Sequence, residues 1–199
     1  MRTTGDTRAR IVTAATELFR LQGYAASGMK QIVAAADAPY GSAYHFFPGG
    51  KAQLGEEVIR TSGAAYRELI VDLFSPISPT QDADPATVTR DAFTAAAQTL
   101  HELDFTDPCP IATIALEVAG THEGLRLATA EVFAGWTDAL AAFYRAGGIA
   151  EPAAHETASS VIALLEGAFM LGRAARSTDP VLAASRAAAA IVRAAQSES

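Results

Sequence analysis

Cysteine is almost missing from this sequence and asparagine is missing altogether. Cys109 is the only cysteine among 199 residues, so the chain can form neither an internal disulfide nor a multi-cysteine zinc site. A thiol-poor composition fits a reducing cytoplasm, which is where we expect the protein to reside. No apolar run approaches the roughly 18 residues that a membrane span needs, and residues 1–10 lack the apolar stretch of a signal peptide. We therefore expect a soluble protein with no membrane partner.

Lysine is also scarce, and charge is unevenly distributed along the chain. Lys30 and Lys51 are the only lysines, and the net charge is −7. Residues 1–60 contain seven cations against five acids, whereas residues 61–199 contain eight against seventeen. A mildly basic segment followed by an acidic one indicates two different tasks. On charge alone, nucleic-acid binding by the first segment is only weakly indicated.

Helix-forming residues are what the sequence has in abundance. Alanine is the commonest residue and aromatics make up 8%, which favours an all-α fold because alanine is the best helix former. Apolar residues such as Ile11, Ala15, Leu18 and Phe19 recur at helical spacing. The expected elements are about nine helices and no strand. They cover about residues 7–22, 28–36, 39–47, 51–74, 84–103, 111–120, 123–146, 151–176 and 179–196.

Glycine, serine and proline mark the expected helix ends. Gly23 is expected to end the first helix in a left-handed turn, and Ser27 to cap the second one. Residues 48–50 stop the third helix, and residues 75–81 form a linker. Three acid–proline pairs are expected to open helices by one shared device, an acidic N-cap followed by a first-turn proline. These pairs are Asp84–Pro85, Glu151–Pro152 and Asp179–Pro180.

The second and third helices are short and separated by only three or four residues. This is the spacing of a helix-turn-helix, in which the second helix of the pair enters the major groove. Tyr40, Ser42 and His45 would then be exposed toward phosphates or base edges, and Lys51 would stand at a helix start that attracts phosphate. A helical hairpin with solvated polar residues fits the spacing equally well.

The stretch from Arg8 to Ile59 resembles the TetR family of bacterial one-component repressors. The motifs that carry the resemblance are Ala14-Ala15, Leu18-Phe19, Gly23-Tyr24, Ile32 through Ala36, and Gly41-Ser42-Ala43-Tyr44-His45-Phe46-Phe47-Pro48-Gly49-Gly50-Lys51. Four segments resemble the LmrA/YxaF-like subgroup. They are Ala38-Pro39-Tyr40-Gly41-Ser42, Phe46-Phe47-Pro48-Gly49-Gly50-Lys51, Cys109-Pro110-Ile111-Ala112 and Ala115-Leu116-Glu117.

The resemblance implies a DNA-binding helix-turn-helix domain over residues 1–50 and a ligand-binding and dimerisation domain over residues 51–199. It implies a ligand-responsive regulator, a repressor that leaves a palindromic double-stranded operator when a small apolar or aromatic effector binds. Tyr44 and Lys51 would hold phosphates, and Ser27 would cap its helix and touch phosphate. The implied DNA-binding residues are Arg8, Arg10, Ser27, Lys30, Gln31, Pro39, Tyr40, Gly41, Ser42, Tyr44, His45 and Lys51.

Three departures from the family pattern leave an alternative open. Relatives usually have glycine at the position of Asp37, and serine or threonine at the position of Pro39. They often have lysine at the position of Tyr40. Asp tolerates a left-handed turn and proline suits a first helical turn, so the geometry can survive. A helical adaptor that binds a small molecule and has lost DNA binding remains the second hypothesis.

The second domain is expected to hold the effector and to form a homodimer through the last two helices. Burial of those two apolar helices inside a monomer is the alternative. The candidate ligand residues, each of which could equally be plain core, are Phe93, Leu100, Ile114, Trp136, Leu140, Phe143, Glu166, Phe169, Met170 and Arg173. Glu166 lies in an apolar stretch, residues 161–172, that we expect to be buried on more than one face. This carboxylate needs a partner there, either a ligand, the two-fold axis, or an arginine such as Arg173 or Arg126.

No constellation in the sequence supports an enzyme, a metal site or a bound cofactor. The four histidines are scattered without metal spacing or a neighbouring nucleophile. Residues 49–51 are too short for a phosphate-binding loop. Cys109 has no nearby cation or histidine in sequence to activate its thiol, so we expect it to pack or to start a helix.

Overall fold

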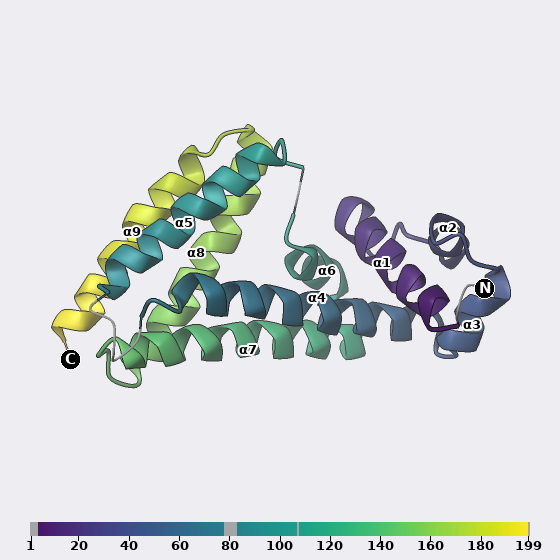
Figure 1. Cartoon of the computed structure of the whole chain (residues 1–199), viewed down its shortest axis with the longest axis horizontal. Helices are drawn as coiled ribbons and strands as arrows, with labels where there is room; N and C mark the ends of the chain where they lie inside the picture. The colour runs from purple at the N-terminus through teal and green to yellow at the C-terminus, as the bar shows by residue number, and fades with distance from the viewer. Residues whose placement is uncertain (1–3, 78–82, 107, 199) are drawn as a thin grey trace. The chain divides into compact units, whose positions relative to one another are not determined.

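The computed structural model describes residues 4–77, 83–106 and 108–198. Within those ranges the chain forms nine helices and no strand, as expected (Figure 1). The predicted linker at residues 75–81 lies partly outside the described residues. The helices are α1 (Thr4–Gln22), α2 (Met29–Ala35), α3 (Tyr40–Phe46), α4 (Gly50–Phe74), α5 (Pro85–Glu102), α6 (Pro110–Val118), α7 (Glu123–Ala146), α8 (Ala153–Ala175) and α9 (Asp179–Ser197).

The chain divides into two compact units. Unit 1 consists of Met1–Ala65 and Cys109–Phe133, and unit 2 of Tyr66–Pro108 and Ala134–Ser199. The long helices α4 and α7 therefore contribute to both units, and α6 belongs to the unit that holds α1, α2 and α3. The expected boundary at residue 50 divides functions, DNA binding from ligand binding, and stays a prediction.

In unit 1, α1 packs against α2, α3 and α6. Its buried face consists of Ile11, Ala15 and Phe19, which are spaced one turn apart and so line one side of the helix. Phe47 and Leu54 are fully buried in the same unit. This packing holds the two short helices α2 and α3, which are too short to be stable alone.

The two turns around α2 have the backbone conformations that the sequence predicted. Gly23 has φ +86°, and Asp37 has φ +47° in the turn before α3. Ser27, in contrast, does not cap α2. The N-cap is Gly28, which makes no side-chain cap bond. The Ser27 hydroxyl is buried and donates to the Gly23 carbonyl at 2.8 Å. The serine therefore stabilises the turn and does not cap the amides of α2.

The expectation that three acid–proline pairs open helices by one device was wrong for two of them. Asp84 caps α5, accepting from the amides of Ala86 and Thr87. Before α8 the N-cap is Pro152 and before α9 it is Thr178, both without a side-chain cap bond. Glu151 pairs with Arg145 instead. A nearby cation competes with the helix amides for the carboxylate, which the local sequence does not show.

Unit 2 is built around α5, α8 and α9, with α5 and α9 side by side (Figure 1). Small residues on both helices permit this close packing, and the buried ones include Ala86, Ala92, Ala97, Ala184, Ser185, Ala188, Ala189 and Ala195. Tyr144 is the largest fully buried side chain in the described part of the unit, and its hydroxyl lies 2.9 Å from the Thr89 hydroxyl. Burial raises the pKa of Tyr144, because the charged phenolate would be desolvated.

Helix α8 is less buried within the chain than its apolar sequence predicted. Met170 is 60% exposed and Leu171 57% exposed, and residues 164–167 are half-buried. By length and composition α8 is apolar enough to cross a membrane. Its packing against α9 instead gives one part of that apolar surface a partner inside the protein.

Candidate nucleic-acid interface

Helix α3 has one buried side and one exposed side. Ala43 is fully buried on the inner side, and so is Phe47 directly after the helix. On the outer side Tyr40 is 46% and Tyr44 49% exposed, with ring centroids 5.7 Å apart and hydroxyl oxygens 3.5 Å apart. The hydrogen bond with Tyr40 raises the pKa of Tyr44, so this phenol stays protonated and able to donate.

Other predicted DNA-binding residues extend this exposed surface. Gly41 and His45 are exposed on α3, and a Cβ placed on Gly41 would meet no atom within 4 Å. Ser42 is half-buried, and Pro39 is the N-cap residue of α3. On α2, Lys30 and Gln31 are exposed, and the Gln31 amide donates to Gln22 at 3.0 Å. We call Lys30, Gln31, Tyr40, Gly41, Ser42, Tyr44 and His45 the α2–α3 surface.

Three of the cationic side chains predicted to bind DNA form hydrogen bonds within the protein. Arg8 bonds Glu57 at 2.5 Å and lies over the Phe47 ring. Arg10 Nη1 donates to the carbonyls of Ala36 and Asp37, at 2.5 and 2.8 Å. These contacts use the cations to fix the fold of unit 1. Any phosphate contact by Arg8 or Arg10 stays a prediction.

The third cation, Lys51, binds the turn that precedes α2. Its ammonium donates to the carbonyls of Tyr24 and Ala25 at 2.8 and 3.3 Å and lies 4.3 Å from the centroid of the Tyr24 ring. Burial lowers the pKa of Lys51, and the charge of Glu117 partly opposes this. Glu117 on α6 accepts from the amides of the same two residues, at 2.9 and 2.7 Å. Sequence reasoning noted Glu117 only as part of a subgroup motif, because its partners are 92 and 93 residues away.

The predicted ligand residues lie mainly in the cores. In unit 2, Phe93, Leu100 and Leu140 belong to one buried cluster, against which Phe143 and Phe169 pack. Trp136 is buried in unit 2 and stacks on Tyr66, whereas Ile114 is buried in unit 1. Met170 is exposed. Their role in ligand binding stays a prediction, as does the alternative that they are plain core.

The two remaining polar candidates lie on α8. Glu166 is half-buried. Of its two suggested arginine partners, Arg126 binds Glu123 through two hydrogen bonds, at 2.8 and 2.7 Å, and Arg173 donates to the Phe105 carbonyl at 3.2 Å. Cys109, expected to pack or to start a helix, is half-buried and is the N-cap of α6.

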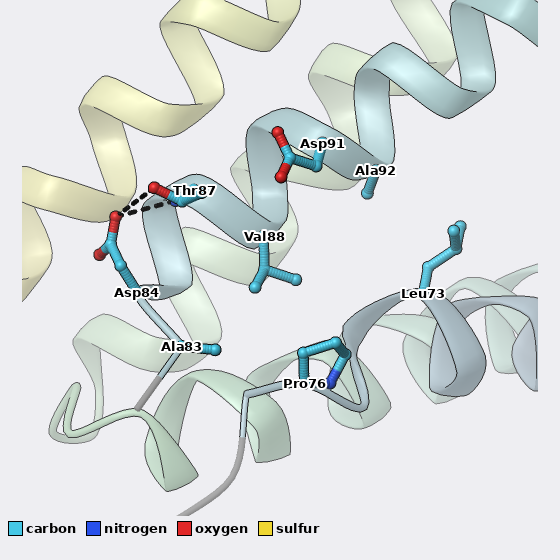
Figure 2. A pocket seen from close by; sticks show the side chains of 8 residues that line it. All are labelled: Leu73, Pro76, Ala83, Asp84, Thr87, Val88, Asp91 and Ala92. Carbon is cyan, nitrogen blue, oxygen red and sulfur yellow. Dashed lines mark hydrogen bonds between the residues drawn. The ribbon is translucent and has the colours of Figure 1, made fainter. Parts of the chain in front are cut away.

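A pocket of about 520 Å³ lies in unit 2, where α4 ends and α5 begins (Figure 2). Its lining residues are Leu73, Pro76, Ala83, Asp84, Thr87, Val88, Asp91 and Ala92. None of these is a predicted ligand residue. Asp84 is already engaged as the N-cap, with Thr87 donating to it at 2.7 Å (Figure 2), so its carboxylate serves the helix end.

Two family models cover most of the chain. Residues 11–58 match the model of bacterial regulatory proteins of the tetR family, and residues 85–187 match the C-terminal domain of LmrA/YxaF-like transcriptional regulators. The chain belongs to the TetR family. It is therefore a DNA-binding transcriptional regulator with a helix-turn-helix, of a family whose members are not enzymes, and the resemblance inferred from the motifs is confirmed.

Curated relatives and solved structures agree with this membership. The HTH-type transcriptional regulator LmrA of Bacillus subtilis is 34% identical, over 89% of this chain and 92% of its own. The uncharacterized HTH-type regulator YxaF of the same species is 32% identical, over 92% and 93%. A regulatory protein TetR from Rhodobacter sphaeroides shares the fold, with a TM-score of 0.80 at 21% identity over 93% of this chain and 98% of that one. The TetR-family fold thus extends over both units.

Proposed function

We propose that this TetR-family regulator is a cytoplasmic homodimeric repressor that binds a palindromic operator and is released by a small apolar or aromatic effector. The observation that carries the proposal is the α2–α3 surface. It places two tyrosine hydroxyls, a histidine and a half-buried serine on the exposed side of a helix that is anchored by Ala43 and Phe47. Hydroxyls and imidazole can bond both phosphates and base edges.

Two of the three departures from the family pattern fit this proposal. Asp37, at a position where relatives usually have glycine, adopts a left-handed conformation with φ +47°, and Pro39 occupies the N-cap position of α3. Tyr40 replaces a cation but keeps a hydrogen-bonding group on the exposed face. The adaptor hypothesis, which depended on these three residues, therefore has no separate observation in its favour.

The exposed apolar side of α8 supports dimerisation through α8 and α9. Met170 and Leu171 are mostly exposed, and Ile191 on α9 is 36% exposed. Large apolar side chains left in contact with water favour an interface. A symmetric pair of such helices would bury them and would present two heads to two half-sites.

The aromatic cluster of unit 2 supports an apolar effector. Phe93 is buried there, and Phe143 and Phe169 pack against the same cluster; aromatic side chains of this kind suit contact with a flat apolar molecule. We propose that the effector stabilises a dimer conformation in which the heads no longer match the half-sites. Helix α4, which has residues in both units, would carry this change.

The test uses a duplex that the native protein enriches from a random-sequence library. The native chain of 20.7 kDa should have twice that mass in light scattering and should bind the duplex in a gel shift. Tyr44→Phe should bind about 10-fold more weakly, because a hydrogen bond to a charged phosphate is lost. Tyr66→Phe is the matched control, since Tyr66 stacks on Trp136 in unit 2 and its loss of a hydroxyl should leave DNA affinity unchanged.

Three results would overturn parts of this proposal. A monomer by light scattering would remove the dimer and with it the palindromic operator. A native protein that enriches no duplex would remove operator recognition. For the effector, flat aromatic compounds added to the native complex should release the duplex, and a library of such compounds with no effect would count against an apolar aromatic ligand.

A further inference from the structure

The turn that leads from α1 into α2 is held by groups outside itself. Residues 23–28 form this turn, which we call the entry turn. The amides of Tyr24 and Ala25 donate to the two carboxylate oxygens of Glu117 on α6, at 2.9 and 2.7 Å. One carboxylate thus binds two successive peptide amides, an arrangement of charged hydrogen bonds that is stronger than neutral pairs.

The carbonyls of the same two residues are bound from α4. The Lys51 ammonium donates to Tyr24 and Ala25, at 2.8 and 3.3 Å, and lies over the Tyr24 ring. Both polar groups of these two peptide residues are therefore bonded by oppositely charged side chains. We call the contacts of Glu117 and Lys51 with Tyr24 and Ala25 the entry-turn clamp.

The shape of the backbone shows that the carboxylate fits closely. Gly23 is buried with φ +86°, and a Cβ at this position would lie 2.1 Å from Glu117 Oε1. Glycine is therefore favoured by the conformation, and a side chain at this position would push the Glu117 carboxylate away from its present place. Tyr24 also packs edge-on against Phe19, with centroids 5.2 Å apart, so the turn is seated in the core of unit 1.

The clamp connects α6 with the helix-turn-helix. The entry turn leads directly into α2 and α3, and α6 lies beside α1 within unit 1 (Figure 1). We infer that Glu117 and Lys51 are positioning residues for DNA binding. They hold the Tyr24–Ala25 peptide from two sides, so that α6 fixes the placement of α2 and α3, and Lys51 uses its charge on this peptide instead of on a DNA phosphate. The inference rests on the proposed DNA recognition by α3.

Salt dependence separates positioning from phosphate contact. Each phosphate that a protein cation neutralises contributes about 0.9 to the slope of log affinity against log salt concentration. The variants are Glu117→Gln, Lys51→Met and the double variant, titrated with the library-selected duplex from about 50 to 300 mM KCl. Glutamine offers one acceptor to two amides, and methionine keeps the aliphatic length of lysine without its donors.

We expect each single variant to bind the duplex about 3- to 10-fold more weakly, with an unchanged salt slope. The double variant should bind no more weakly than about the worse single variant, because both act through one peptide. Hydrogen exchange at the amides of Tyr24 and Ala25 should accelerate in all three. Glu131→Gln is the matched control, since Glu131 pairs with Arg60 on exposed side chains of the same unit at 2.7 Å, and it should change none of these quantities.

The inference would be overturned if Lys51→Met lowered the slope of log affinity against log salt concentration by about 0.9 and if the losses of DNA affinity added in the double variant. Lys51 would then be a residue that contacts a DNA phosphate. Single variants that bind as the native protein does would also overturn it. If Lys51→Met loses its thermal unfolding transition, Lys51→Gln takes its place with the same expected result. If the native protein enriches no duplex, the proposed DNA recognition by α3 is itself wrong. The inference about the entry-turn clamp, which rests on that recognition, then falls with it.

Discussion

The two compact units are stabilised by different interactions. In unit 1, charged side chains bind the backbone of the turns on both sides of α2, through Lys51 and Glu117 before it and Arg10 after it. In unit 2, the contact of α5 with α9 is made by buried alanines such as Ala188 and Ala189. Polar contacts have defined directions and fix the position of a segment, whereas apolar packing supplies most of the free energy of folding.

This difference predicts different responses to mutation. Removal of a charged group in unit 1 should displace a turn at moderate cost, with the effect concentrated in DNA affinity. Removal of volume in unit 2 should lower the free energy of unfolding. The three substitutions that follow test this contrast, in order of decreasing expected effect.

Phe93→Ala should have the largest effect, because Phe93 is 1% exposed in the core of unit 2. Truncation of a buried phenylalanine costs about 3–5 kcal/mol of unfolding free energy, through lost transfer energy and the remaining cavity. Urea unfolding followed by circular dichroism measures it. Leu103→Ala is the control, since Leu103 is 43% exposed and its loss should cost less than about 1 kcal/mol.

A small loss of unfolding free energy in Phe93→Ala would weaken the contrast between the two units. It would favour the hypothesis that Phe93 contacts the effector. If the ring lines a cavity that holds the effector, its removal enlarges a space that is already loosely filled, and the cost falls below about 2 kcal/mol. The measurement therefore also discriminates between the core and the ligand roles that Phe93 shares with its aromatic neighbours Phe143 and Phe169.

Helix positions could be predicted from the sequence because they depend on local signals. Repeats such as Ile11, Ala15 and Phe19 mark a buried face, and Gly23 and Asp37 adopt the left-handed conformations expected at helix ends. These signals act over one or two turns, which is the range over which sequence spacing reports geometry. All nine helices followed from them, within the part of the chain that the structure describes.

The partners of charged residues could not be predicted, because they lie far apart in sequence. Lys51 is 27 residues from Tyr24, and Glu117 is 93 residues from it. Ser27 looked like a cap from its neighbours, but a carbonyl in its own turn takes its hydroxyl. Of the three side chains expected to be exposed on this helix, Tyr40 and His45 are exposed and Ser42 is half-buried, whereas the role of Tyr44 was implied only by the family resemblance.

Arg10→Met should have the second largest effect and should act on both stability and DNA affinity. Arg10 binds the carbonyls of Ala36 and Asp37, directly at the end of α2, where a cation also interacts favourably with the helix dipole. Loss of these bonds should cost about 2 kcal/mol of unfolding free energy. It should also weaken binding of the selected duplex, because the turn that orients α3 is loosened.

Arg60→Met is the matched control for Arg10. Arg60 is exposed and pairs with Glu131 at 2.7 Å, and an exposed pair contributes less than about 1 kcal/mol. Equal losses of unfolding free energy in Arg10→Met and Arg60→Met would show that the bonds of Arg10 to backbone carbonyls contribute no more than an exposed ion pair. If Arg10→Met kept its stability and instead lowered the salt slope by about 0.9, the residue would be a phosphate ligand.

Asp84→Ala should have the smallest effect, although Asp84 is a polar group with several bonds in the unit dominated by apolar packing. Its carboxylate accepts from the amides of Ala86 and Thr87 and from the Thr87 hydroxyl. Loss of such an N-cap costs about 1 kcal/mol. The hydrogen bond from the Thr87 side chain is the main cause that holds the pKa of Asp84 below its usual value of 3.8.

The sign of the pH dependence follows from this lowered pKa. The folded state prefers the carboxylate, so the cap contributes its full stability above the unfolded pKa near 3.8 and loses it as pH falls through the folded value. Urea unfolding of native protein and Asp84→Ala should therefore differ by about 1 kcal/mol at neutral pH, and the difference should shrink below a pH of about 4. Asp84→Asn keeps an acceptor without the charge, so it should fall between the two at neutral pH with little acid dependence. If the difference in unfolding free energy between the native protein and Asp84→Ala stayed constant into acid, the Asp84 side chain would stabilise α5 by packing. Unit 2 would then be stabilised at this helix end, too, by packing and not by a charged hydrogen bond.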